Sequence, residues 1–166
     1  DLVKVTAEGK VKDFASLKFG LRSVQEHLGK ILLNDHELFI RAALVQGFYP
    51  DTIYGEPSDE LIRDEVTKAK SLGLNVLRLH IKAFDTRYLD ICDELGMLLH
   101  CDIPIAEPIS HSELGPDSEV GLNCAAAIVA QVRRDYSHPS IFLWSVMNEL
   151  GLEKIETREQ AGYKEF

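Results

Sequence analysis

The chain alternates short apolar runs with longer segments of helical periodicity, and this alternation restricts its fold more than any other feature. Four runs are almost continuously apolar: residues 41–47, 74–81, 97–103 and 141–147. Apolar side chains at helical spacing separate them, and the predicted helices begin at Ser58 or Asp59, at Thr86 and at Ser118. Near-continuous apolar runs are typical of parallel strands that are covered on both faces. The alternation therefore predicts an α/β fold with a parallel sheet.

The segment before the first of these runs is predicted to be extended. Residues 1–25 place Val, Thr and Phe among Gly and polar residues, which favours strands. Residues 30–33 and 37–40 flank Asn34-Asp35-His36, and this predicts a hairpin because Asn and Asp tolerate turn conformations. At the other end of the pattern, residues 141–147 are expected to form a strand buried on both faces.

Polar side chains collect where the predicted parallel strands end. They are Arg78, His80, Asp102, Asn148 and Glu149. Function in such folds lies at the carboxyl ends of the strands, and an apolar strand has little structural use for a charge there. These convergent groups predict a site for a polar ligand.

Each of these residues also has a plain structural interpretation. Asn148 could cap a following helix, Arg78 could be a buried ion-pair partner of Asp102 or Glu149, and His80 could be a satisfied structural histidine. Trp144 could belong to the core or stack on the apolar face of a sugar ring.

Two further pairs are expected to have no part in chemistry. Lys82 and Asp85 are expected in a solvated loop, and Cys101 and Cys124 are expected to be small core residues.

Composition excludes several classes of function. The 166 residues make about one domain, and 18 Lys and Arg against 27 Asp and Glu give a formal charge of −9, which disfavours nucleic-acid binding. The longest apolar run, residues 124–130, is too short for a membrane span. Three cysteines without a C-x-x-C pair argue against a disulfide framework or a zinc site, and slightly favour the cytoplasm. The opening at Asp1 shows no readable leader and suggests an excerpt of a longer chain.

Several segments resemble glycoside hydrolase family 2, the family of β-galactosidases, β-mannosidases and β-glucuronidases. The closest is DYSHPSIFLWS at residues 135–145, followed by Asn148-Glu149, which is similar to the family's R-D-x-N-H-P-S-I-x-x-W-S-x-x-N-E motif. KSLGLNVLR at residues 70–78, Tyr88 with CDELGML at 92–98, and FGLR at 19–22 with LND at 33–35 resemble other family segments in the same order.

The resemblance implies a (β/α)8 TIM barrel of which this chain holds the first four β/α units. Residues 1–28 would be the last strands of an immunoglobulin-like β-sandwich and a linker, and residues 29–166 the first half of the catalytic barrel. It implies a retaining, exo-acting β-glycosidase that hydrolyses O-glycosidic bonds of a carbohydrate substrate. Glu149 would be the general acid/base, Asn148 would bind the sugar 2-hydroxyl and Arg78 would orient the nucleophile.

The resemblance has departures. His80 falls one place earlier than in the family's R-T-S-H, Asp102 stands where Glu is common, and Asn34-Asp35 replaces Asn-Gly. The nucleophile lies on the family's seventh strand, outside this chain, so the isolated chain is expected to be inactive and to need the rest of its barrel as a partner. No metal or organic cofactor is expected. The alternatives are a non-catalytic carbohydrate-binding or structural barrel domain, and an aldolase, which would want a Lys at a strand end.

Overall fold

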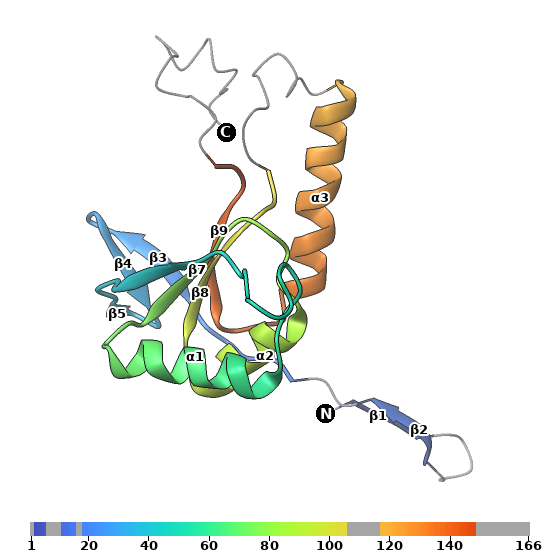
Figure 1. Ribbon diagram of the computed structural model, residues 1–166, viewed down its shortest axis with the longest axis horizontal. Coiled ribbons are helices and arrows are strands. Elements are labelled where there is room, and N and C mark those ends of the chain that lie inside the picture. The colour runs from blue at the N-terminus through green and yellow to red at the C-terminus, as the bar shows by residue number, and fades with distance from the viewer. Residues whose placement is uncertain (1, 6–10, 16–17, 106–116, 149–166) are drawn as a thin grey trace.

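A parallel four-stranded sheet forms the centre of the molecule, in a computed structural model that describes residues 2–5, 11–15, 18–105 and 117–148 (Figure 1). Its strand order is β6-β7-β8-β9, with bounds Ala42–Val45, Val76–Leu79, Leu98–Asp102 and Ile141–Ser145. The connections contain α1 (Asp59–Ser71), α2 (Thr86–Leu95) and α3 (Glu119–Asp135). Each strand lies inside one of the four predicted apolar runs, and all three neighbouring pairs are parallel. The predicted α/β fold with a parallel sheet is confirmed.

The helices begin at side chains that accept hydrogen bonds from their first turn. Ser58 caps α1 and Ser118 caps α3, each accepting from the backbone N–H three residues on. The prediction that Thr86 caps α2 was wrong by one residue, because Asp85 accepts from the N–H of Arg87 and Thr86 is already helical. None of the helices in the described part of the chain is long and apolar enough to cross a membrane.

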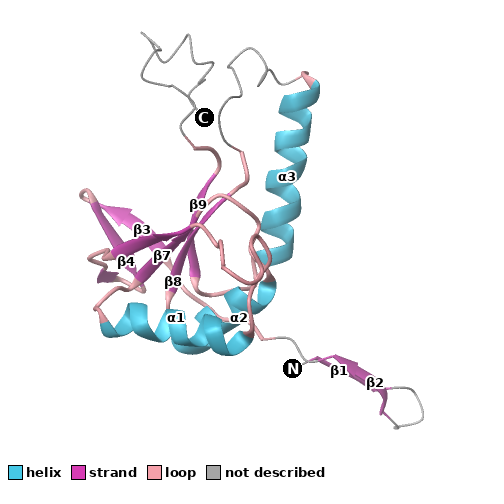
Figure 2. Ribbon diagram, in the orientation of Figure 1, coloured by secondary structure: helices cyan, strands magenta, loops and turns pink. Residues whose placement is uncertain are grey.

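The hydrophobic core lies between one face of the sheet and helices α1 and α2, which lie side by side below the strands in Figure 2. The buried residues that pack together there come from both layers: Ile62, Val66, Leu77, Leu79, Phe84, Tyr88, Leu89, Ile91, Cys92, Met97, Leu99, Cys101 and Ile141. Burying such a side chain stabilises the fold by roughly 1.5–3 kcal/mol. The sheet and the first two helices therefore hold each other in place.

The opposite face of the sheet is partly open. Leu44, Arg78, His100 and Leu143 lie in register, one on each strand, and Leu44 and Leu143 are 51% and 40% exposed. The expectation that residues 141–147 form a strand buried on both faces was wrong for this reason. Ile141 is buried in the core, whereas Leu143 points to the side that the described residues leave uncovered.

The residues before the parallel sheet form antiparallel pairs. β1 (Leu2–Val5) pairs with β2 (Val11–Ala15), and β4 (Lys30–Leu33) pairs with both β3 (Val24–His27) and β5 (His36–Glu37). The predicted hairpin around Asn34 is confirmed, with a shorter second strand than expected, and Asn34 and Asp35 have φ of 50° and 65°. β3 and β4 pair across the expected domain boundary at residues 28 and 29, and that division stays a prediction.

Candidate active site

An ion pair between neighbouring strands forms the centre of the site. Arg78 on β7 and Asp102 on β8 lie on the open face, because Arg78 is in register with His100 and Asp102 is two residues further along. The Nε atom of Arg78 donates to both carboxylate oxygens of Asp102, at 3.1 and 3.0 Å, and its Nη2 lies 2.9 Å from Oδ2. Asp102 is 1% exposed, whereas the side chain of Arg78 is 32% exposed. The contacts with Asp102 thus hold the guanidinium of Arg78 in place, and one side of it stays accessible at the open face.

Two histidines lie against the same carboxylate. Nδ1 of His80 is 2.5 Å from Oδ2 of Asp102, and Nε2 of His100 is 3.4 Å from Oδ1. Burial lowers the pKa of His100, and the Arg78 charge lowers it further, while Asp102 acts in the opposite direction. Sequence analysis missed His100, although its place two residues before Asp102 puts both on the same face of a strand.

Asn148 completes the group at the end of β9. Its Oδ1 accepts a hydrogen bond from Nη2 of Arg78 at 3.1 Å, and its backbone N–H donates to the carbonyl of Ile105 at 3.0 Å. The structure therefore brings Arg78, His80, Asp102 and Asn148 together at one rim. Glu149 directly follows Asn148 and lies outside the described residues.

Trp144 does not join these residues. It is in register with Cys101, a core residue, and its partly buried side chain packs against the hydrophobic core. Of the two interpretations offered by the sequence, the core residue is the one that this position favours.

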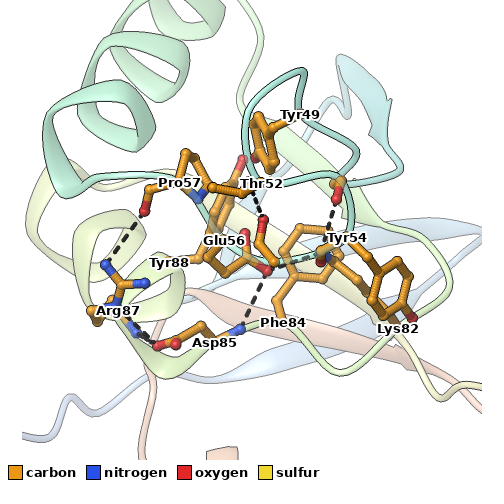
Figure 3. A network of polar contacts seen from close by, with 12 residues as sticks. Tyr49, Thr52, Tyr54, Glu56, Pro57, Lys82, Phe84, Asp85, Arg87 and Tyr88 are labelled. Carbon is orange, nitrogen blue, oxygen red and sulfur yellow. Dashed lines mark hydrogen bonds and ion pairs between the residues drawn. The ribbon is translucent and has the colours of Figure 1, made fainter.

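Lys82 is not in a solvated loop, so that expectation was wrong. Its side chain is 5% exposed, and Nζ donates to the carbonyls of Gly47 and Tyr54 at 2.9 and 2.7 Å (Figure 3). Nζ also lies 3.2 Å from Oε1 of Glu56, whose side chain is equally buried. The loop that follows β6 holds Lys82 in place. The sequence around Lys82 does not reveal these contacts, because the loop is distant from it in the chain.

One cluster away from the rim has donor atoms close enough to hold a metal ion. Asp90, Asp93 and His138 each place one such atom within 4.8 Å of the others. Asp93 already uses both oxygens, since Oδ2 is 2.6 Å from Nδ1 of His138 and Oδ1 accepts from the N–H of Ser140 at 2.8 Å. The cluster is accounted for as a tie between α2 and the turn before β9.

The fold and the rim define a class of protein: an α/β domain with a polar site at the carboxyl ends of its parallel strands. Residues 27–164 match the family described as Glycosyl hydrolases family 2, TIM barrel domain. The chain belongs to this family, as the resemblance predicted, and so to a family of β-glycosidases. Its four parallel strands fit part of such a barrel.

Relatives and solved structures agree with this assignment. The chain is 30% identical over 138 residues to a beta-galactosidase of Leuconostoc mesenteroides subsp. mesenteroides, covering 81% of this chain and 13% of the relative. It is 28% identical over 149 residues to mouse (Mus musculus) beta-glucuronidase, covering 89% and 22%. The structure of a β-glucuronidase from Ruminococcus gnavus in complex with D-glucuronic acid shares the fold, with a TM-score of 0.79, 22% identity and coverage of 95% and 26%. The chain thus spans less than a quarter of the length of the Leuconostoc beta-galactosidase and of the mouse beta-glucuronidase.

Proposed function

We propose that the chain supplies the acid/base half of the active site of a retaining, exo-acting β-glycosidase. The observation that carries the proposal is the continuous set of contacts from Asp102 through Arg78 to Asn148. These contacts hold Asn148, the residue directly before Glu149, at the rim. Glu149 is the general acid/base in this proposal, and Asn148 binds a hydroxyl of the sugar.

The chemistry of a retaining glycosidase suits these groups. Two carboxyl groups about 5–5.5 Å apart act on the glycosidic bond: one attacks the anomeric carbon, and the other protonates the departing oxygen and later activates water. The acid must hold its proton near the working pH, so a neutral amide such as Asn148 is a suitable neighbour for it. Arg78 orients the nucleophile, which the proposal places on a later strand of the same barrel.

The rest of the barrel is the expected partner of this chain. Leu44 and Leu143, half-exposed on the open face of the sheet, support a role for further strands in covering that face. In this proposal residues 1–28 end a β-sandwich, residues 29–166 form the first half of the catalytic barrel, and the substrate is a carbohydrate.

One observation favours a second candidate, a barrel domain without catalysis. Arg78 is already paired through two atoms with the buried Asp102, which is also what a purely structural ion pair requires. In that case the scaffold would bind carbohydrate or carry other domains, and Glu149 would be a structural residue.

Replacement of Glu149 in a full-length protein that contains this chain distinguishes the two. Because the relatives are named beta-galactosidase and beta-glucuronidase, the assay uses aryl β-galactosides and aryl β-glucuronides with good and poor leaving groups. Glu149→Gln should reduce hydrolysis of substrates with poor leaving groups by roughly 10²–10⁴-fold. The hydrolysis rate of activated aryl glycosides should fall less, because their leaving groups depart with little protonation. An unchanged rate with a poor leaving group would identify Glu149 as structural.

A further inference from the structure

Lys82 occupies a closed site made by residues far from it in the sequence. Two backbone carbonyls, of Gly47 and Tyr54, accept hydrogen bonds from Nζ, and the Glu56 carboxylate lies 3.2 Å away. The ammonium also lies 4.7 Å from the centroid of the Tyr54 ring and 4.8 Å from that of Phe84. Carbonyls, a carboxylate and aromatic faces together form a well-matched site for a desolvated cation.

Gly47 is independent evidence that this site requires close approach. Its φ is +67°, a backbone conformation that residues other than glycine rarely adopt. A Cβ atom there would lie 2.5 Å from Cε and 2.8 Å from Nζ of Lys82, and 2.9 Å from Cζ of Phe84. The backbone at residue 47 therefore fits against the lysine only because it carries no side chain.

The same contacts join two segments of the active-site rim. Gly47, Tyr54 and Glu56 belong to the loop between β6 and α1, residues 46–58, whose first residues line a cavity of about 290 Å³ beside the end of β6. Lys82 lies two residues after His80, which contacts Asp102. Figure 3 shows the lysine reaching into this loop from the segment after β7.

We infer that Lys82 is a positioning residue that holds the β6–α1 loop as a wall of the sugar site. The inference rests on the proposed glycosidase function and adds a determinant of substrate binding to it. Without the ammonium, the carbonyls of Gly47 and Tyr54 and the Glu56 carboxylate would lose their shared partner, and the loop would leave its place. Binding of the sugar then suffers more than bond cleavage, because the loop borders the site without carrying the acid/base.

The test is chemical rescue in a full-length protein that contains this chain. Lys82→Ala removes three methylene carbons and the amine, so propylammonium is the probe that matches the vacated space. Lys82→Met, which retains an unbranched apolar side chain and lacks the amine, provides a second variant if the alanine variant does not fold. Lys68→Met is the matched control, since Lys68 pairs with Asp64 on the surface and its side chain is 71% exposed.

The activity of each folded variant is measured with an aryl β-glycoside, with the folded fraction taken from circular dichroism. We expect kcat/KM to fall roughly 10–100-fold in Lys82→Ala and Lys82→Met, mainly through a higher KM, and to stay unchanged in Lys68→Met. Propylammonium should restore Lys82→Ala, whereas 1-propanol should not.

Three results would overturn the inference: unchanged kcat/KM per folded molecule, a loss that propylammonium does not restore, or equal restoration by 1-propanol. A wild-type protein without glycosidase activity would instead refute the proposed function. The failures of the two proposals are therefore distinguishable.

Discussion

Replacing Asp102 by Asn should destabilise the protein far more than the same replacement of a surface aspartate whose ion pair is equally short. Asp102 is 1% exposed and accepts charge-assisted contacts from Arg78 and His80. Asn keeps one acceptor oxygen, but its amide group faces donors where the second oxygen was. One or two contacts are lost, each worth about 1.5–3 kcal/mol, and partial exposure of Arg78 reduces its share. We therefore expect a loss of about 2–4 kcal/mol.

The matched control is Asp64→Asn. Asp64 lies 2.6 Å from Nζ of Lys68, but the two side chains are 49% and 71% exposed. Exposed pairs of this kind contribute about 0–1 kcal/mol, so this variant should unfold almost like the wild type. Thermal unfolding of a full-length protein, followed by calorimetry, should show the barrel transition lowered by roughly 5–15 °C for Asp102→Asn. Equal shifts for the two variants would refute the argument that burial makes Asp102 the fixed centre of the rim.

Three other predictions test separate parts of the account. The isolated chain of residues 1–166 should hydrolyse no aryl glycoside at any pH, because a double displacement needs a second carboxylate from a later strand; retaining hydrolysis by this chain would show that the nucleophile or the fold is misassigned. In the native protein at pH 8, iodoacetamide followed by peptide mass spectrometry should label Cys124 before Cys92 and Cys101, since burial raises the pKa of Cys92 well above its ordinary value and that of Cys101 to about 12. Gly96→Ala should cost about 1–2 kcal/mol in urea unfolding through its φ of +67° alone, as its Cβ would meet nothing closer than 3.6 Å; an unchanged midpoint would contradict this.

The parallel sheet could be predicted because its signals are local. Each strand lies within an apolar run and has a polar residue at its last position or directly after it, and each helix begins beside a side chain able to cap it. Asp85 and Thr86 show the limit of this reasoning, since both residue types cap helices and only the backbone angles of Asp85 decide between them. Proximity of Arg78 to Asp102 followed from the rule that carboxyl ends of parallel strands share an edge.

The features that could not be predicted depend on pairing between distant segments. Trp144 faces the core because of its register with Cys101, and that register includes an irregularity between Leu99 and His100. The environment of Lys82 is made by Gly47, 35 residues earlier, so the charge of the residue gave a misleading indication of exposure. His100 is a different case, because alternation along the strand from Asp102 was enough to find it.

The proposed role of Glu149 is tested most directly by azide rescue of Glu149→Ala in a full-length protein that contains this chain. The nucleophile of that variant can still form the glycosyl-enzyme from an activated aryl β-glycoside, but water lacks a base to activate it. Azide is a charged nucleophile that needs no such base and fits the space left by the carboxylate. We predict that azide accelerates turnover and that nuclear magnetic resonance identifies the product as the β-glycosyl azide. Wild-type hydrolysis by Glu149→Ala, or a product azide of α configuration, would contradict the assignment of Glu149 as the acid/base of a retaining enzyme.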